Sequence, residues 1–145
     1  MPSPKNKTAK AILLVEDDVI IRLGLAEHLR ECGFTVLEAA GAHEARTILV
    51  AGPSIDILLS DAQLAGPDTG FALAQWVRRH RPQVKVILVA TTAHKVEAAG
   101  ALCRHTPRHD ANTLDARIRA MMAERARRMR PPAATAGTVR KRKAN

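Results

Sequence analysis

A short apolar run that ends in a carboxylate is the feature that most constrains the fold of this chain. Residues 55–61 read IDILLSD, with four aliphatic side chains in the first five positions. Such a run is typical of a strand that is buried on both faces of a parallel sheet. Gly52–Pro53 and Gly66–Pro67 bound it on either side. Ligands gather at the carboxyl ends of strands in open parallel sheets, so Asp61 is the first candidate functional residue.

Similar apolar runs alternate with segments of helical periodicity along the chain. Strands are predicted at residues 11–15, 34–39, 55–61, 84–90 and, from a weaker pattern, 101–104. Helices are predicted at residues 19–32, 42–51, 70–80, 94–100 and 113–129. This alternation predicts an α/β protein of the flavodoxin-like type. We expect a (βα)5 three-layer sandwich with a parallel five-stranded sheet and helices on both faces.

The charge of the chain divides it into a near-neutral domain and two basic ends. The net charge is +9, but ten of the 23 basic side chains lie in residues 1–10 and 127–145, whereas all 14 acids lie between residues 11 and 126. The pattern predicts a disordered arm at 1–10, one domain at 11–130 and a disordered basic tail at 131–145. A general nucleic-acid-binding protein is therefore disfavoured, although the tail leaves weak nucleic-acid contact open.

Composition also indicates where such a protein would work. No apolar run approaches the roughly 20 residues that span a membrane. The first ten residues are not followed by the apolar segment of a signal peptide. Cys32 and Cys103 are isolated in the sequence and are expected to be reduced thiols. We therefore expect a cytoplasmic protein without a membrane-spanning segment.

Acidic residues follow two of the predicted strands. Glu16 and Asp17 come directly after residues 11–15, and Asp61 ends its own strand, while Asp18 is a natural N-cap for the next helix. In the common strand order 2-1-3-4-5 these two strand ends are neighbours. Carboxylates crowded in one pocket need a proton or a cation, and their hard oxygen atoms suit Mg²⁺. A carboxylate beside Mg²⁺ can also attack a phosphoryl group.

From about residue 10 to residue 126 the chain resembles the receiver domain of two-component response regulators. The motifs that carry this resemblance are ILLVEDD at 12–18, Arg22, DILLSD at 56–61, the loop DAQLAGPDTG at 61–70, and PQVKVILVATT at 82–92. The resemblance implies that Asp61 is the phosphoacceptor. It also implies that Asp17 binds Mg²⁺ directly, Glu16 binds it through water, and the backbone carbonyl of Gln63 completes the ligands.

Two positions depart from the family pattern. The family has Thr or Ser at the end of the fourth strand, where this chain has Ala90, so Thr91 is either a displaced phosphoryl contact or the N-cap of the next helix. The family also has a Lys before a Pro after its fifth strand. The corresponding region, residues 104–109, reads RHTPRH and has no lysine, although Arg104 or Arg108 is a candidate source of the charge.

The resemblance implies a response regulator, and since no second folded domain is expected after residue 130, we expect a single-domain protein without a fused DNA-binding domain. A sensor histidine kinase or histidine phosphotransfer protein would phosphorylate Asp61 with Mg²⁺ as cofactor, and the output would be contact with a still unidentified downstream protein. No enzymatic activity beyond this self-phosphorylation is expected. One alternative is a receiver-like interaction module that does not depend on phosphorylation. Another, a phosphatase of the haloacid dehalogenase type, ranks last because its Asp-x-Asp position here reads Glu16–Asp17–Asp18.

Overall fold

The computed structural model describes residues 9–104 and 111–133. Its strands are β1 (Ala11–Val15), β2 (Thr35–Ala39), β3 (Ile57–Asp61) and β4 (Lys85–Val89). Its helices are α1 (Val19–Glu31), α2 (Ala42–Ala51), α3 (Gly70–His80), α4 (Thr92–Leu102) and α5 (Ala111–Met129). The predicted arm and tail lie largely outside the described residues.

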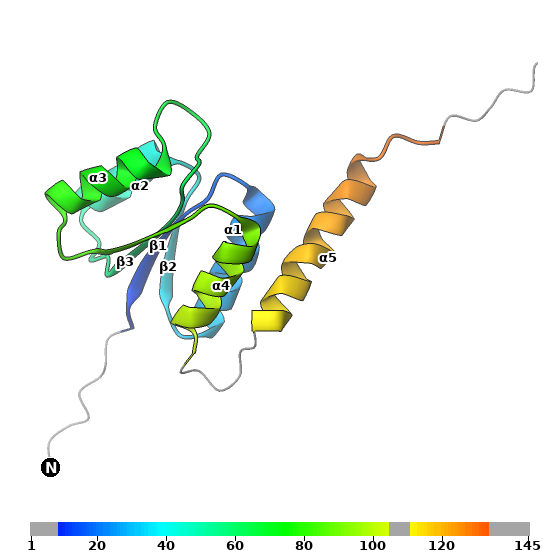
Figure 1. Ribbon diagram of the computed structural model, residues 1–145, viewed down its shortest axis with the longest axis horizontal. Helices are drawn as coiled ribbons and strands as arrows, with labels where there is room; N and C mark the ends of the chain where they lie inside the picture. Colours follow the sequence, from blue (N-terminus) through cyan, green and yellow to red (C-terminus); the bar gives the residue numbers. More distant parts are fainter. Residues whose placement is uncertain (1–8, 105–110, 134–145) are drawn as a thin grey trace, which may run out of the picture.

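The strands form one parallel sheet in the order β2-β1-β3-β4 (Figure 1). The register pairs Val15 of β1 with Ser60 of β3 and with Ala39 of β2. The carboxyl ends of β1 and β3 therefore lie side by side, as the strand alternation predicted. This register brings Glu16 and Asp61 to one edge of the sheet.

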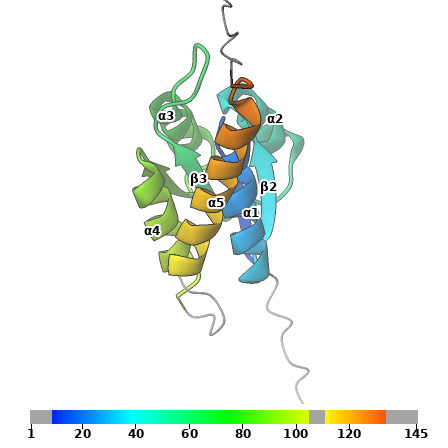
Figure 2. The same ribbon diagram turned by 90° about the vertical axis from the view of Figure 1, so that its right-hand side faces the viewer.

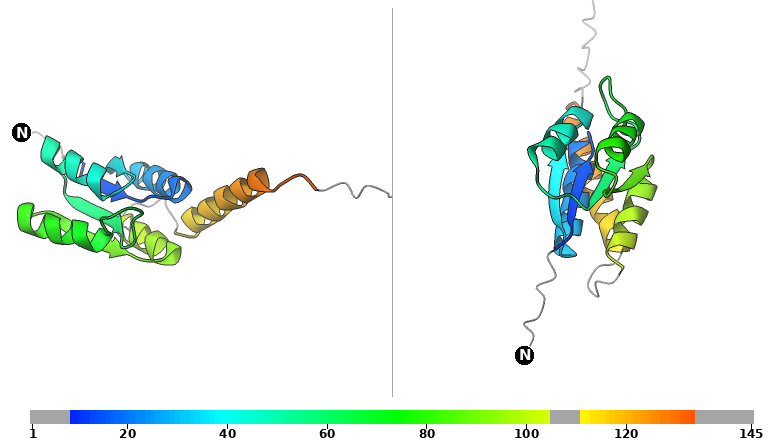
Figure 3. Two further views of the ribbon diagram at one scale, coloured as in Figure 1. Left: turned by 90° about the horizontal axis from the view of Figure 1, so that it is seen from above. Right: turned by 90° about the vertical axis from the view of Figure 1, so that its left-hand side faces the viewer.

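Helices cover both faces of the sheet, which confirms the flavodoxin-like α/β fold. One core cluster joins the sheet to α2 and α3, and the other joins it to α1, α4 and α5. α5 packs against α1 and α4, and Figures 1 and 3 show it beyond these two helices as seen from the sheet. Figure 2 shows α5 in front of the gap between α1 and α4. Its buried residues Leu114 and Ile118 belong to the core cluster that also contains residues of α1 and α4.

The fifth strand predicted at residues 101–104 is wrong. Ala101 and Leu102 form the end of α4, and Cys103 is its C-cap. Val96, Ala99 and Cys103 are buried at helical spacing, so the apolar stripe of α4 continues to its end. Within residues 9–104 and 111–133 the sheet has four strands, and β4 forms one edge.

The two cysteines form a disulfide, which corrects the expectation of reduced thiols. Cys32 caps α1 and Cys103 caps α4, and their Cα atoms lie 5.7 Å apart. The two residues are 71 positions apart in the sequence. Their pairing arises from the packing of α1 beside α4, which no local pattern encodes. The bond ties the C-terminal ends of these helices together.

Candidate functional site

Three carboxylates meet at the carboxyl edge of the sheet. Glu16 follows β1, Asp17 is next to it, and Asp61 is the last residue of β3. One oxygen atom from each lies within 4.8 Å of the others. Glu16 is 2% exposed and Asp61 8%, whereas Asp17 is exposed. The structure thus brings together the acids that the sequence predicted would cluster.

Backbone contacts fix Asp61 and the loop that follows it. The N–H of Gln63 donates to Asp61 Oδ1 at 2.8 Å, and the N–H of Ala62 donates to the carbonyl of Val89 at 2.9 Å. The N–H of Gly70 returns to the carbonyl of Ala62 at 3.1 Å. A Cβ atom at Gly70 would overlap the Asp61 carbonyl oxygen. Glycine is therefore required where α3 begins against the end of β3.

Glu16 and Asp17 are also held by backbone groups. Glu16 Oε1 accepts the N–H of Asp18 at 3.2 Å, and Asp17 Oδ2 accepts the N–H of Ala65 at 3.0 Å. The latter contact joins the acid pair after β1 to the loop after β3. Arg22 is one of the positions that carry the family resemblance. Its side chain donates to the Glu16 carbonyl at 2.8 Å. The acid cluster thus combines residues from the carboxyl ends of β1 and β3.

Lys95 is the site residue that the sequence analysis missed. Its Nζ lies 2.6 Å from Glu16 Oε2 and 2.8 Å from Asp61 Oδ2, and the residue is 5% exposed. It lies in α4 beside the buried residues Val96 and Ala99. A lysine on the buried stripe of a helix was the available signal, because an ammonium is rarely buried without an anionic partner.

Burial and ion pairing act in opposite directions on the pKa values of Glu16 and Lys95. Burial is the largest influence on Glu16 and raises its pKa above the ordinary value, against the opposing hydrogen bond and charge of Lys95. Burial alone would lower the pKa of Lys95. Its contacts with Asp61 and Glu16 outweigh that effect, so the pKa of Lys95 is raised. Lys95 is therefore an ammonium group at neutral pH.

Asp18 lies just outside the cluster and has a structural role, as predicted. Its Oδ1 accepts the N–H groups of Ile20 and Ile21 at 2.9 and 3.1 Å, which caps α1. Two nitrogen atoms of Arg125 in α5 donate to the same carboxylate at 3.1 Å. Burial opposes these contacts, but together they hold the pKa of Asp18 below its ordinary value.

The structure gives Thr91 the N-cap role. Its hydroxyl accepts the N–H of His94 at 3.1 Å, and the residue is exposed at the start of α4. Ala90, between β4 and Thr91, is exposed as well. Arg104 and Arg108 were the candidates for the positive charge of the missing lysine. Arg104 is exposed after α4, and Arg108 lies outside the described residues. Among the described residues, Lys95 supplies the ammonium that contacts Asp61.

The acid cluster has the donors that a magnesium ion requires. Carboxylate oxygens are the hard ligands that Mg²⁺ prefers, and Glu16, Asp17 and Asp61 present them within one small volume. The residues therefore fit the metal that the resemblance implies. Lys95 Nζ already contacts one oxygen of Glu16 and one of Asp61. Any divalent cation bound here would therefore lie close to the Lys95 ammonium group.

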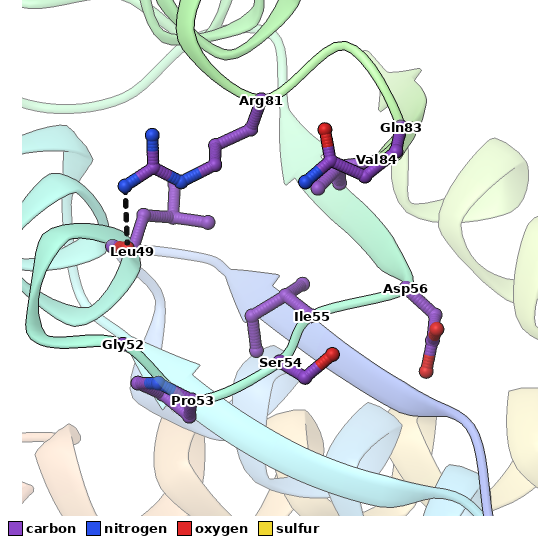
Figure 4. Close-up of a pocket in the computed structure, with 9 residues that line it drawn as sticks. All are labelled: Leu49, Gly52, Pro53, Ser54, Ile55, Asp56, Arg81, Gln83 and Val84. Carbon is purple, nitrogen blue, oxygen red and sulfur yellow. Dashed lines mark hydrogen bonds between the residues drawn. The ribbon is translucent and has the colours of Figure 1, made fainter.

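A second hollow lies at the opposite edge of the sheet, before β3 and β4 (Figure 4). It has a volume of about 520 Å³. Its two charged side chains already have partners: Asp56 Oδ2 accepts the N–H of Ala11 at 2.7 Å, and Arg81 donates to the Leu49 carbonyl at 3.4 Å. Both charged side chains of this hollow are therefore already engaged with backbone groups.

A parallel sheet with acids at its carboxyl edge, one of them ending β3, defines a receiver-type domain. Residues 12–106 match the family described as "Response regulator receiver domain". The chain belongs to this family.

Comparisons with known proteins agree with this family assignment. The chain is 38% identical over 80 residues to the sensor kinase CckA of Brucella abortus (strain 2308). This match covers 54% of the chain but only 8% of that relative. The solved receiver domain of the hybrid histidine kinase CckA is 28% identical, with a TM-score of 0.52, over 77% of this chain and 98% of that one.

Two further solved structures share the fold. A response regulator receiver protein from Sinorhizobium medicae WSM419 is 21% identical, with a TM-score of 0.56, over 81% of this chain and 98% of that one. The response regulator protein TrrA from Thermotoga maritima, solved in complex with Mg²⁺–BeF, is 23% identical, with a TM-score of 0.54, over 77% of this chain and 98% of that one. Within residues 9–104 and 111–133, no helix is long and apolar enough to cross a membrane.

Proposed function

We propose that this protein accepts a phosphoryl group on Asp61 from a phosphohistidine of a sensor histidine kinase or a histidine phosphotransfer protein. The observation that carries the proposal is the meeting of Glu16, Asp17 and Asp61 within 4.8 Å at adjacent strand ends. Membership of the receiver family and the similarity to a receiver domain of a hybrid histidine kinase support it. Histidine kinases, the first source of this phosphate, take it from ATP, so we infer that the protein works in the cytoplasm.

The transfer is a displacement at phosphorus. A carboxylate oxygen of Asp61 forms a bond to the phosphorus atom as the bond from phosphorus to the donor's imidazole nitrogen breaks, and that nitrogen keeps the electron pair. The Gln63 N–H and the Lys95 ammonium hold the Asp61 carboxylate from two sides. They fix its direction before the donor arrives. The other ring nitrogen of the donor's phosphohistidine carries a proton, so the products are an aspartyl phosphate and a neutral imidazole.

The neighbouring acids would hold the metal. Glu16, Asp17 and Asp61, with the backbone carbonyl of Gln63, are the proposed ligands of Mg²⁺, which when bound supplies positive charge to the phosphoryl oxygens. Thr91 is a secondary candidate for a phosphoryl contact, because its hydroxyl would first have to leave the N-cap of α4. The added negative charge at Asp61 would then alter a surface that binds a downstream protein.

The test is phosphorylation by acetyl phosphate with Mg²⁺, followed by intact mass. We expect a gain of one phosphoryl group that is lost in Asp61→Asn and on removal of Mg²⁺ with a chelator. Asp68→Asn is the matched control. Asp68 lies in the same loop but pairs with Arg46 at 2.6 Å, away from the cluster, so this variant should still be phosphorylated.

A module that does not depend on phosphorylation is the second candidate. The exposed Ala90 and the capping role of Thr91 favour it, because the hydroxyl expected at the phosphoryl group is used elsewhere. This candidate predicts no adduct from acetyl phosphate or from a phosphorylated histidine phosphotransfer protein. It also predicts equal partner binding by wild type and Asp61→Ala. That pair of results would overturn the phosphoacceptor role.

A further inference from the structure

The Lys95 ammonium lies on the oxygen atoms that a metal would use. Its Nζ contacts Glu16 Oε2 at 2.6 Å and Asp61 Oδ2 at 2.8 Å, and its side chain is 6% exposed. α4 fixes the backbone from which this side chain extends, because the Lys95 N–H bonds to the Thr91 carbonyl at 3.0 Å and Val96 beside it is buried in the core. The cation is therefore part of the packed helix.

Charge explains why this cation is present. Glu16, Asp17 and Asp61 crowd three carboxylates into one place, and Lys95 offsets one of their negative charges. Mg²⁺ approaches carboxylate oxygens to about 2.0–2.1 Å and would offset two. Both cations cannot rest on the same oxygens, because at such separations they repel strongly in a site partly shielded from water. One of them has to move.

We propose that Lys95 competes with divalent cations at this site, so that Mg²⁺ binds by displacing the Lys95 ammonium from Glu16. The inference rests on the proposed function only in taking the acid cluster as a divalent-cation site. Glu16 Oε2 becomes free for the metal, directly or through water, while the ammonium keeps its contact with Asp61. Metal binding is thereby coupled to the position of the first two turns of α4, even before any phosphoryl transfer.

The first test compares Mg²⁺ binding by wild type and Lys95→Met in isothermal titration calorimetry. Methionine keeps most of the side-chain volume and removes the charge. Coupling between two binding events is commonly about 5- to 150-fold. Taking the displacement of Lys95 as a coupling of this size, we expect Lys95→Met to bind Mg²⁺ at least about tenfold more tightly. Lys85→Met is the control, because Lys85 is an exposed lysine of β4. It removes the same charge and should change the Kd less than about twofold.

A merely structural role for Lys95 gives the opposite result. Loss of a structural counter-ion would loosen the site, so the affinity of Lys95→Met for Mg²⁺ would be unchanged or weaker. Either result overturns the proposal.

A second test uses the wild-type chain and does not depend on how the variant folds. An amine-reactive ester labels lysines, and peptide mass spectrometry compares Lys95 with Lys85. We expect slow labelling of Lys95 without metal, a several-fold increase with Mg²⁺, and reversal with a chelator. Labelling of Lys85 should stay constant. Unchanged or slower labelling of Lys95 with Mg²⁺ overturns the proposal.

Both readouts separate this inference from the phosphoacceptor role, because neither uses a phosphodonor. Phosphorylation of Asp61 with no change of Mg²⁺ affinity in Lys95→Met would overturn the competition and leave the function intact. Tighter Mg²⁺ binding by Lys95→Met without a phosphoryl adduct would support the competition and count against the function. Absence of Mg²⁺ binding by both proteins would overturn the competition together with the metal site.

Discussion

The two parts of the chain that meet at the candidate site hold their charges in different ways. The acids belong to the part from β1 to α3 and stand at strand ends, where the sheet register and backbone N–H groups place them. The cations that pair with the carboxylates of Glu16, Asp61 and Asp18 are Lys95 and Arg125, which belong to the part after β4 and extend from helices. The anionic side is therefore fixed by the backbone, and the cationic side depends on how α4 and α5 pack.

The two parts of the chain also differ in how their helices are attached to the sheet. α1, α2, α3 and α4 each pack against the sheet. α5 is attached to the rest through α1 and α4, and α4 is tied to α1 by the Cys32–Cys103 disulfide. Loosening of the second part should therefore displace the side chains of Lys95 and Arg125 more than it displaces the carboxylates at the edge of the sheet. Three perturbations test this difference.

Reduction of the disulfide should have the largest effect on stability. The bond closes a loop with a sequence separation of 71 residues, and loop-closure entropy assigns such a bond about 4 kcal/mol. Denaturant unfolding with and without reductant measures the loss. The double variant Cys32→Ser with Cys103→Ser is the control and should not respond to reductant. A loss below about 1 kcal/mol would mean that packing alone holds α4 beside α1.

Gly70→Ala should damage the first part instead. The new Cβ overlaps the Asp61 carbonyl, and because this neighbour is backbone the strain has to move β3 or α3. We expect a loss of about 3 kcal/mol in thermal or urea unfolding. Gly41→Ser is the control, because no atom lies within 4 Å of its added Cβ and its φ of −164° is extended backbone. A change in Gly41→Ser above about 0.5 kcal/mol would contradict this assignment.

The smallest effect should come from the contact between Asp18 and Arg125. Asp18→Ala loses both the N-cap of α1 and the ion pair, so we expect a loss of about 1–2 kcal/mol. Arg125→Ala loses only a pair whose side chains are 34% and 26% exposed, and should cost less than about 1 kcal/mol. Urea unfolding measures both variants. Asp18→Asn keeps the capping oxygen and should resemble Arg125→Ala. Equal losses in Asp18→Ala and Arg125→Ala would mean that the cap contributes little.

The sequence predicted the first part well because its signals are local. Each apolar run, the Asp18 cap and the acids after β1 and β3 can be read within a few residues, and parallel strand order places the acids together. The second part depends on contacts between distant residues. Neither Lys95 nor Cys103 has a neighbour in the sequence that points to its partner. The short segment at 101–104 was assigned to a strand although it continues the buried stripe of α4.

The disulfide also makes a closed covalent ring of residues 32–103. Asp61 and Lys95 belong to this ring, whereas Glu16, Arg125 and the whole of β1 lie outside it. A single backbone cut inside the ring leaves the polypeptide in one piece, and a cut outside it divides the chain. The site is therefore assembled across the boundary of the ring. After a backbone cut inside the ring, covalent continuity rests on one sulfur–sulfur bond, whereas the assembly of the site rests on the pairing of β1 with β3.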